Sequence, residues 1–99
     1  MTSAEPIDLC CLLWARPGQE AALSAYEDEV LDLVAGHGGA VISRGVGDGK
    51  DGRPLEVQFF RFPAQAALDG YLADPRRTAL SEVRDRVIAR TELFPVGLR

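Results

Sequence analysis

A chain of 99 residues is near the commonest size of one domain, and we expect residues 1–99 to fold as a single domain. The formal net charge is −4, and the acidic residues are spread along the chain. This argues against nucleic acid and against an anionic membrane as partners, because both attract a basic patch. No apolar run approaches the roughly 20 residues that cross a bilayer, so we expect a cytoplasmic protein.

The only cysteines, Cys10 and Cys11, are adjacent in a predicted strand, where neighbouring side chains point apart. This arrangement suits neither an ordinary disulfide nor a zinc site. His37 is the only histidine, which also argues against a metal centre. We therefore expect reduced cysteines, no metal site and no cofactor.

Residues 7–14 are predicted to form a strand with two apolar faces. One face carries Ile7, Leu9, Cys11 and Leu13. The other face carries Asp8, Cys10, Leu12 and Trp14. A chain of this length can cover one face with its own helices, and a second copy of the chain is the simplest cover for the other.

A helix is predicted over residues 19–36, because apolar residues recur at a spacing of three or four. This apolar stripe consists of Leu23, Tyr26, Val30, Leu33 and Val34. The acidic residues of the segment are assigned to its solvated face; they are Glu20, Glu27, Asp28, Glu29 and Asp32. The glycines at 36, 38 and 39 are expected to end the helix.

Two further strands, Ala40–Val46 and residues 55–62, are predicted on either side of a polar hairpin loop at residues 45–54. A second helix follows over residues 64–73, and Asp74-Pro75 restarts it as N-cap and first helical residue. The last strand is predicted at residues 90–96. This β-α-β-β-α-β order predicts the α+β class: a ferredoxin-like antiparallel sheet with both helices on one face. The bare, apolar face predicts pairing into a homodimer.

Several short motifs resemble the dimeric α+β barrel superfamily of ferredoxin-like proteins. They are Tyr26-x-x-x-Val30, Gly38-Gly39-x-x-x-x-Arg44-Gly45, Phe62-Pro63 and Tyr71-Leu72-Ala73-Asp74-Pro75. They are most similar to a small, mostly uncharacterised bacterial branch, which usually has an acidic residue and a serine where this chain has Arg61 and Ala64. The superfamily includes cofactor-independent monooxygenases of aromatic polyketides, haem-degrading monooxygenases, lactone isomerases and plain ligand-binding dimers. The resemblance therefore implies a dimeric α+β barrel with a pocket between sheet and helices.

Arg44 and His37 are the candidate catalytic residues. Arg44 lies in an otherwise apolar strand, where it would clamp a carboxylate or enolate oxygen, or form an ion pair with Glu56 or Glu92. Histidine is the side-chain type that ordinarily titrates near neutrality, so His37 would serve as a general base or a haem ligand, or a partly cationic imidazole would favour the C-terminal end of the helix dipole.

Four aromatic residues are the candidate ligand-binding residues: Trp14, Tyr26, Phe60 and Tyr71. They would line a pocket for a small aromatic ligand, or they would belong to the core. Two functions stay open at this point. One is a small-molecule-binding protein, in its catalytic form a monooxygenase-like or isomerase-like enzyme that acts on an aromatic or enolic metabolite. The other is a non-catalytic homodimeric accessory or interaction module.

Overall fold

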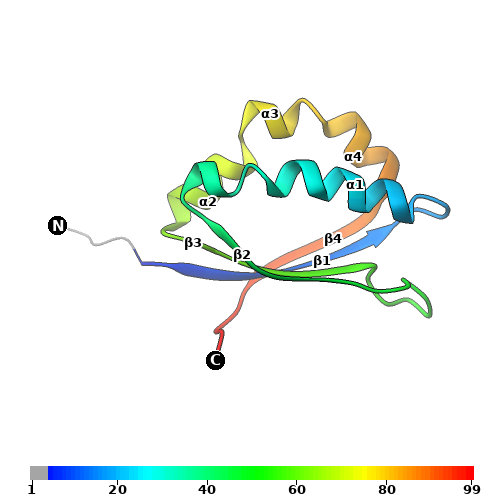
Figure 1. Cartoon of the computed structure of the whole chain (residues 1–99), viewed down its shortest axis with the longest axis horizontal. Helices are drawn as coiled ribbons and strands as arrows, with labels where there is room; N and C mark the ends of the chain where they lie inside the picture. The colour runs from blue at the N-terminus through cyan, green and yellow to red at the C-terminus, as the bar shows by residue number, and fades with distance from the viewer. Residues whose placement is uncertain (1–4) are drawn as a thin grey trace.

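The computed structural model describes residues 5–99, which form one sheet with a layer of helices on one side (Figure 1). The strands are β1 (Ile7–Ala15), β2 (Ala40–Val46), β3 (Glu56–Phe62) and β4 (Ile88–Pro95). The helices are α1 (Glu20–Leu31), the short 3-10 helix η1 (Ala35–His37), α2 (Gln65–Leu72), α3 (Pro75–Thr78) and α4 (Ser81–Val87).

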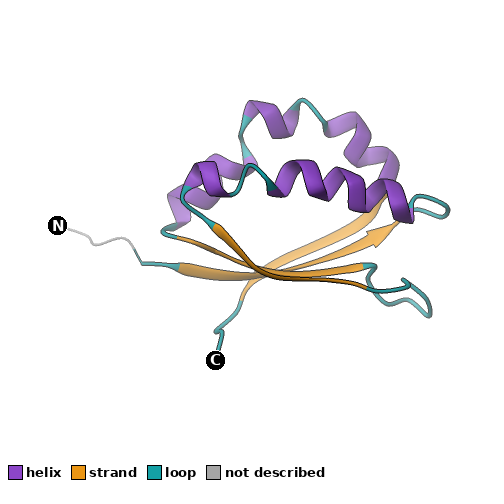
Figure 2. Ribbon diagram, viewed as in Figure 1, coloured by secondary structure: helices purple, strands orange, loops and turns teal. Residues whose placement is uncertain are grey.

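The four strands pair in the order β2-β3-β1-β4, and every neighbouring pair is antiparallel. In the middle of the sheet Cys11 of β1 lies opposite Gln58 of β3 and Leu93 of β4. The helices all lie over the same face of the sheet (Figure 2). The predicted α+β, ferredoxin-like architecture is confirmed.

The core lies between the sheet and the helices. Leu9, Cys11 and Leu13 of β1 face the helical layer and are buried there against α1 and α2. The core side chains of the two helices are Leu23, Tyr26, Val30, Leu68 and Tyr71. The alternation of β1 thus grouped these side chains on one face, and the structure shows that this face meets the helices.

The opposite face of the sheet, which no helix of residues 5–99 covers, is called the open face below. Cys10 lies on this face between Phe59 of β3 and Phe94 of β4, and Leu12 lies opposite Val57. Phe94 is 40% exposed, so the open face presents apolar surface to solvent. Trp14 also belongs to this face, where its Nε1 donates to the Gly52 carbonyl at 2.9 Å.

The helical segments are shorter than predicted. α1 ends at Leu31 rather than continuing to residue 36, and the chain from residue 33 to 38 turns through tighter i→i−3 hydrogen bonds. Gly38 ends this turn with a φ of 76°, which glycine adopts without steric cost. The last strand begins at Ile88, two residues early, because the Ile88 side chain completes the core. The predicted restart at Asp74-Pro75 is confirmed, since the Asp74 side chain accepts from the Arg76 amide.

Candidate functional site

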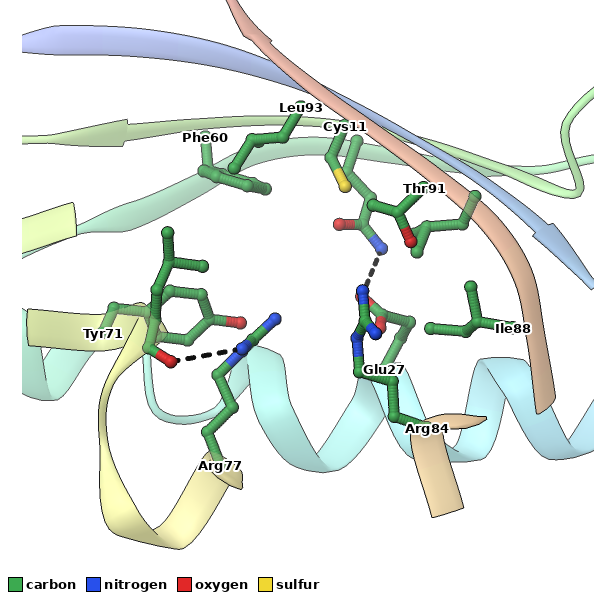
Figure 3. A pocket seen from close by; sticks show the side chains of 12 residues that line it. Cys11, Glu27, Phe60, Tyr71, Arg77, Arg84, Ile88, Thr91 and Leu93 are labelled. Atoms are coloured by element: carbon green, nitrogen blue, oxygen red, sulfur yellow. Dashed lines mark hydrogen bonds between the residues drawn. The ribbon is translucent and has the colours of Figure 1, made fainter. Parts of the chain in front are cut away.

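A cavity of about 40 Å³ lies between the sheet and the helices (Figure 3). Its apolar walls are formed by Cys11, Leu13, Phe60, Leu72, Ile88 and Leu93. Its polar lining residues come from six different elements: Glu27, Gln58, Tyr71, Arg77, Arg84 and Thr91. At least 10–15 Å³ is needed for one water molecule, so the volume corresponds to about three water-sized positions.

Glu27 of α1 faces this cavity and is only 5% exposed. Its Oε1 accepts a hydrogen bond from Gln58 Nε2 at 2.9 Å. Burial raises the pKa of Glu27 above its ordinary value, and the hydrogen bond from Gln58 only partly offsets this effect. Glu27 is therefore a buried carboxyl that resists ionisation.

The assignment of Glu27 to the solvated face of the helix was wrong. Glu27 follows Leu23 by four residues and precedes Val30 by three, so it lies inside the apolar stripe. The sequence thus contained a signal for this residue. A carboxylate on the core face of a helix needs a buried partner, and here that partner is Gln58.

Glu56 of β3 is completely buried next to Glu27 and Gln58. Arg44 approaches it in bidentate geometry, with Nε at 2.7 Å from Oε1 and Nη2 at 2.8 Å from Oε2. Ser24 Oγ donates to Oε2 at 2.6 Å. Burial alone would raise the pKa of Glu56, but the hydrogen bonds from Arg44, Ser24 and Gln58 outweigh it and hold the pKa below its ordinary value.

Gln58 connects the two carboxyl groups. Its Nε2 donates to Glu27 Oε1 at 2.9 Å and to Glu56 Oε1 at 3.0 Å, which commits both of its N–H groups. This fixes the orientation of the amide. The Oε1 atom of Gln58 is buried and has no hydrogen-bond partner within residues 5–99.

Three other buried polar atoms lack a hydrogen-bond partner in the described part of the chain: Tyr26 OH, Arg77 Nε and Thr91 Oγ1. Together with Gln58 Oε1 they are called the orphan atoms below. Native structures rarely leave buried polar groups unpaired, so such groups point to water or a ligand. Three of the four orphan atoms belong to residues that line the cavity: Gln58, Arg77 and Thr91.

Arg77 and Arg84 approach the cavity from the helical layer (Figure 3). The Arg77 guanidinium lies 5.2 Å from the centre of the Tyr71 ring, and its Nη1 donates to the Leu72 carbonyl at 3.3 Å. Burial raises the pKa of Tyr71 to about 12, so its phenol is neutral at pH 7 and is a hydrogen-bond donor.

The cavity brings together two of the residues predicted from the sequence, Phe60 and Tyr71. Tyr26 is buried in the core near them but is not among the residues that line the cavity. Trp14 lies on the open face, where the Arg90 guanidinium stacks at 4.5 Å from its ring centre. The prediction from the sequence did not include five residues that line the cavity: Glu27, Gln58, Arg77, Arg84 and Thr91.

Arg44 lies outside the cavity lining and adopts one of its two predicted arrangements, the ion pair with Glu56. It also donates to Asp28 Oδ1 at 2.5 Å and to the Ser24 carbonyl at 3.1 Å. These contacts link β2, β3 and α1 at one end of the core.

His37 lies behind Tyr71, with its ring 6.2 Å from the Tyr71 ring in edge-on geometry. Its Nε2 is 2.7 Å from Asp74 Oδ2, and the Arg76 side chain binds the same carboxylate. The hydrogen bonds from Arg76 and His37 hold the pKa of Asp74 well below its usual range. His37 thus supports the residue that caps α3, the helix that carries Arg77.

Residues 5–99 contain no group of three or more His, Cys, Asp or Glu side chains arranged to hold a metal ion. Among the helices that the structure describes, none is long and apolar enough to cross a membrane.

No protein-family model matches this sequence, and no curated protein matches it. Solved structures share its fold. A protein of unknown function from Rhodopseudomonas palustris is similar at 20% identity with a TM-score of 0.77, over 96% of this chain and 84% of that one. An antibiotic biosynthesis monooxygenase-like protein from Bacteroides thetaiotaomicron follows at 15% identity and a TM-score of 0.73, over 95% and 90% of the two chains.

A dimeric protein of unknown function from Bacteroides fragilis, described as having a ferredoxin-like fold, is similar at 10% identity with a TM-score of 0.69. That likeness covers 94% of this chain and 96% of the other. At these identities the likeness concerns the fold. The chain has the ferredoxin-like α+β fold that is shared by dimeric bacterial proteins and by monooxygenase-like proteins.

The Arg44–Glu56 pair gives a prediction for stability. Arg44→Ala leaves the buried Glu56 carboxylate without its counter-ion, and we expect it to lower the free energy of unfolding by about 3 kcal/mol. Urea denaturation measures this loss. Arg53→Ala is the control, because Arg53 is exposed and lies 3.5 Å from each of its carboxylate partners; its expected cost is below about 1 kcal/mol. Equal losses for the two variants would contradict the assignment.

Proposed function

We propose that the protein binds a small enolisable carbonyl compound in the cavity and moves a proton on it through the Glu27 carboxyl group. The observation that carries this proposal is the position of Glu27: a buried carboxyl of raised pKa that lines the same cavity as three orphan atoms. A carboxyl group whose pKa is shifted toward the working pH is suited to general acid–base catalysis.

The two carboxyl groups that Gln58 links, Glu27 and Glu56, have different roles in this proposal. The Arg44 pair keeps Glu56 ionised, whereas burial brings Glu27 closer to titration. Environments that push the pKa values of two neighbouring acids apart are a recurrent feature of acid–base sites. Gln58 holds Glu27 in place through its amide N–H and presents Oε1 as an acceptor for an enol hydroxyl group.

The proposed step begins with the Glu27 carboxylate removing a proton from the carbon next to the substrate carbonyl. The electrons of that C–H bond form a C=C bond, and the negative charge moves to the carbonyl oxygen. Arg77 Nε–H and the Thr91 hydroxyl group are free to donate to this enolate oxygen. Return of the proton from Glu27 to another atom completes an isomerisation. In the monooxygenase-like form, O₂ is the oxidant: the enolate carbon forms a C–O bond to it, giving a hydroperoxide after protonation. When that carbon carries a second hydrogen, loss of this hydrogen with cleavage of the O–O bond releases water and leaves a new carbonyl group.

The other predicted residues take positions around this site. Phe60 and Tyr71 are proposed as ligand contacts, because both line the cavity. Arg44 is proposed to act through Glu56 and Gln58, and His37 through Asp74 and Tyr71. Tyr26 is proposed as a donor next to the cavity, since its hydroxyl is an orphan atom.

Proton exchange measured by ¹H NMR in D₂O tests this function. The panel consists of acetone, pyruvate, methyl pyruvate and 1,2-cyclohexanedione, and oxygen uptake is recorded on the same samples. We expect the protein to accelerate exchange for at least one compound, and Glu27→Gln to lower that rate at least about 100-fold.

Glu29→Gln is the matched control, since Glu29 is an exposed glutamate on the same helix and its replacement is expected to leave the rate unchanged. Absence of exchange for the whole panel, or equal rates for Glu27→Gln and the original protein, would refute the proposal.

A second candidate function is a non-catalytic homodimeric accessory or interaction module. The volume of the cavity favours it, because about 40 Å³ is filled by about three water molecules. Such waters would satisfy the orphan atoms without any ligand. This candidate predicts that the original protein forms a dimer but accelerates proton exchange for none of the compounds in the panel.

Both candidates include a homodimer that pairs through the open face. Apolar side chains gather there: Cys10, Leu12, Val57, Phe59 and Phe94. A fold neighbour is described as dimeric. An apolar sheet face of this kind is stabilised when a second sheet covers it, and the indole of Trp14 extends the same face.

Phe94→Asp places a charge in this proposed interface, and we expect the dimer dissociation constant to rise at least about 30-fold. Size-exclusion chromatography with light scattering measures the change. Val46→Asp is the control: Val46 is equally apolar and 59% exposed, but it lies opposite Glu56 on the helix side of the sheet. Loss of the dimer in the control, or a dimer retained in Phe94→Asp, would contradict pairing through the open face.

A further inference from the structure

The cavity carries more positive than negative charge. Arg77 and Arg84 line it, and Glu27 is the only acidic residue among its lining residues as the structure describes them. The neighbouring Glu56 is already paired with Arg44. Asp85 lies 4.0 Å from Arg84 Nη1 and is largely exposed, so it offsets little of the charge of Arg84.

The orphan atoms of the cavity are mostly donors. Arg77 Nε–H and the Thr91 hydroxyl can each donate a hydrogen bond, and Gln58 Oε1 can accept one. Gln58 is 1% exposed, and both N–H groups of its amide donate to carboxyl groups. Its Oε1 atom is therefore available to accept a hydrogen bond from a ligand in the cavity. Arg77 approaches from the helical layer, whereas Thr91 and Gln58 lie on the sheet, so polar groups lie on both sides of the cavity. A ligand with a charged oxygen group and an adjacent hydroxyl or enol suits this set of donors and acceptor.

The space that these groups surround is small. About 40 Å³ corresponds to about three water-sized positions, so the cavity is suited to a small ligand group. Planar carboxylates also match guanidinium geometry better than other groups of that size. Figure 3 shows the Arg77 and Arg84 side chains extending from α3 and α4 toward the sheet at this place.

We propose that the cavity is a carboxylate site, in which Arg77 and Arg84 hold the carboxylate of a small 2-oxo acid. This assignment names the substrate class of the proton-transfer site and rests on that proposed function. The carbonyl carbon of a 2-oxo acid is bonded directly to its carboxylate. Anchoring the carboxylate therefore brings the enolisable part of the molecule close to Glu27 and Gln58.

Pyruvate and methyl pyruvate test the proposal as a matched pair, because they differ only in the charge of the carboxylate and one methyl group. Binding is measured on the intact protein by two-dimensional ¹H–¹⁵N NMR titration. We expect pyruvate to bind at least tenfold more tightly than methyl pyruvate. Inorganic phosphate is the third probe, and we expect it to bind at least tenfold more weakly than pyruvate because its tetrahedral group is larger than a carboxylate.

Arg84→Gln is expected to weaken pyruvate binding at least tenfold and to leave methyl pyruvate binding unchanged. Arg77→Gln is expected to weaken the binding of both compounds, because Arg77 also donates to the carbonyl oxygen that they share. Arg53→Gln, at an exposed arginine of the hairpin loop, is the control and is expected to change neither. The comparison of the three probes on the original protein needs no variant, so it decides the question even if a cavity variant fails to fold.

Equal binding of pyruvate and methyl pyruvate would overturn the carboxylate site, and so would phosphate binding as tight as that of pyruvate. The proposed function would survive either result if Glu27 still promotes exchange of the neutral carbonyl compounds. If the protein binds none of the probes and exchanges no protons, both proposals fail.

Discussion

The polar interior of this fold depends on one interaction, the bidentate pairing of Arg44 with Glu56. An unpaired carboxylate at this depth would be too costly to keep ionised, and the guanidinium group together with Ser24 offsets that cost. The ionised Glu56 then accepts one N–H of Gln58, which leaves the other N–H for Glu27. The Arg44 guanidinium on β2 therefore determines, through Glu56, how the Gln58 side chain is oriented at the cavity.

The helical layer completes the cavity from the other side. Asp74 caps the short helix α3, and His37 and Arg76 hold the Asp74 carboxylate. This arrangement fixes the position from which Arg77 reaches toward the sheet. The cavity thus lies between two polar systems, one anchored in the sheet at Arg44 and one anchored in the helices at Asp74. Neither Arg44 nor His37 lines the cavity. Arg44 instead binds Glu56 in the sheet, and His37 binds Asp74, which caps the helix that carries Arg77.

The architecture could be predicted from the sequence because local patterns encode it. The alternation of β1 separated its two apolar faces, although only the structure shows that the face with Leu9, Cys11 and Leu13 meets the helices, and Asp74-Pro75 marked the start of α3. The pairing of Arg44 with Glu56 was among the predicted alternatives. The cavity was harder to predict, because its polar residues come from elements far apart in the sequence and form no motif. Glu27 alone left a local signal, a charged residue inside an apolar helical stripe.

The network from Arg44 to Gln58 holds Glu27 as a buried carboxyl group with a raised pKa. A ¹³C NMR titration of protein labelled at the glutamate carboxyl carbons measures this pKa directly. We expect Glu27 to titrate above the ordinary value of 4.5 and Glu56 to titrate below it. If Glu27 titrates at or below 4.5, burial does not raise its pKa, and Glu27 is then stably ionised in the cavity rather than poised for proton transfer.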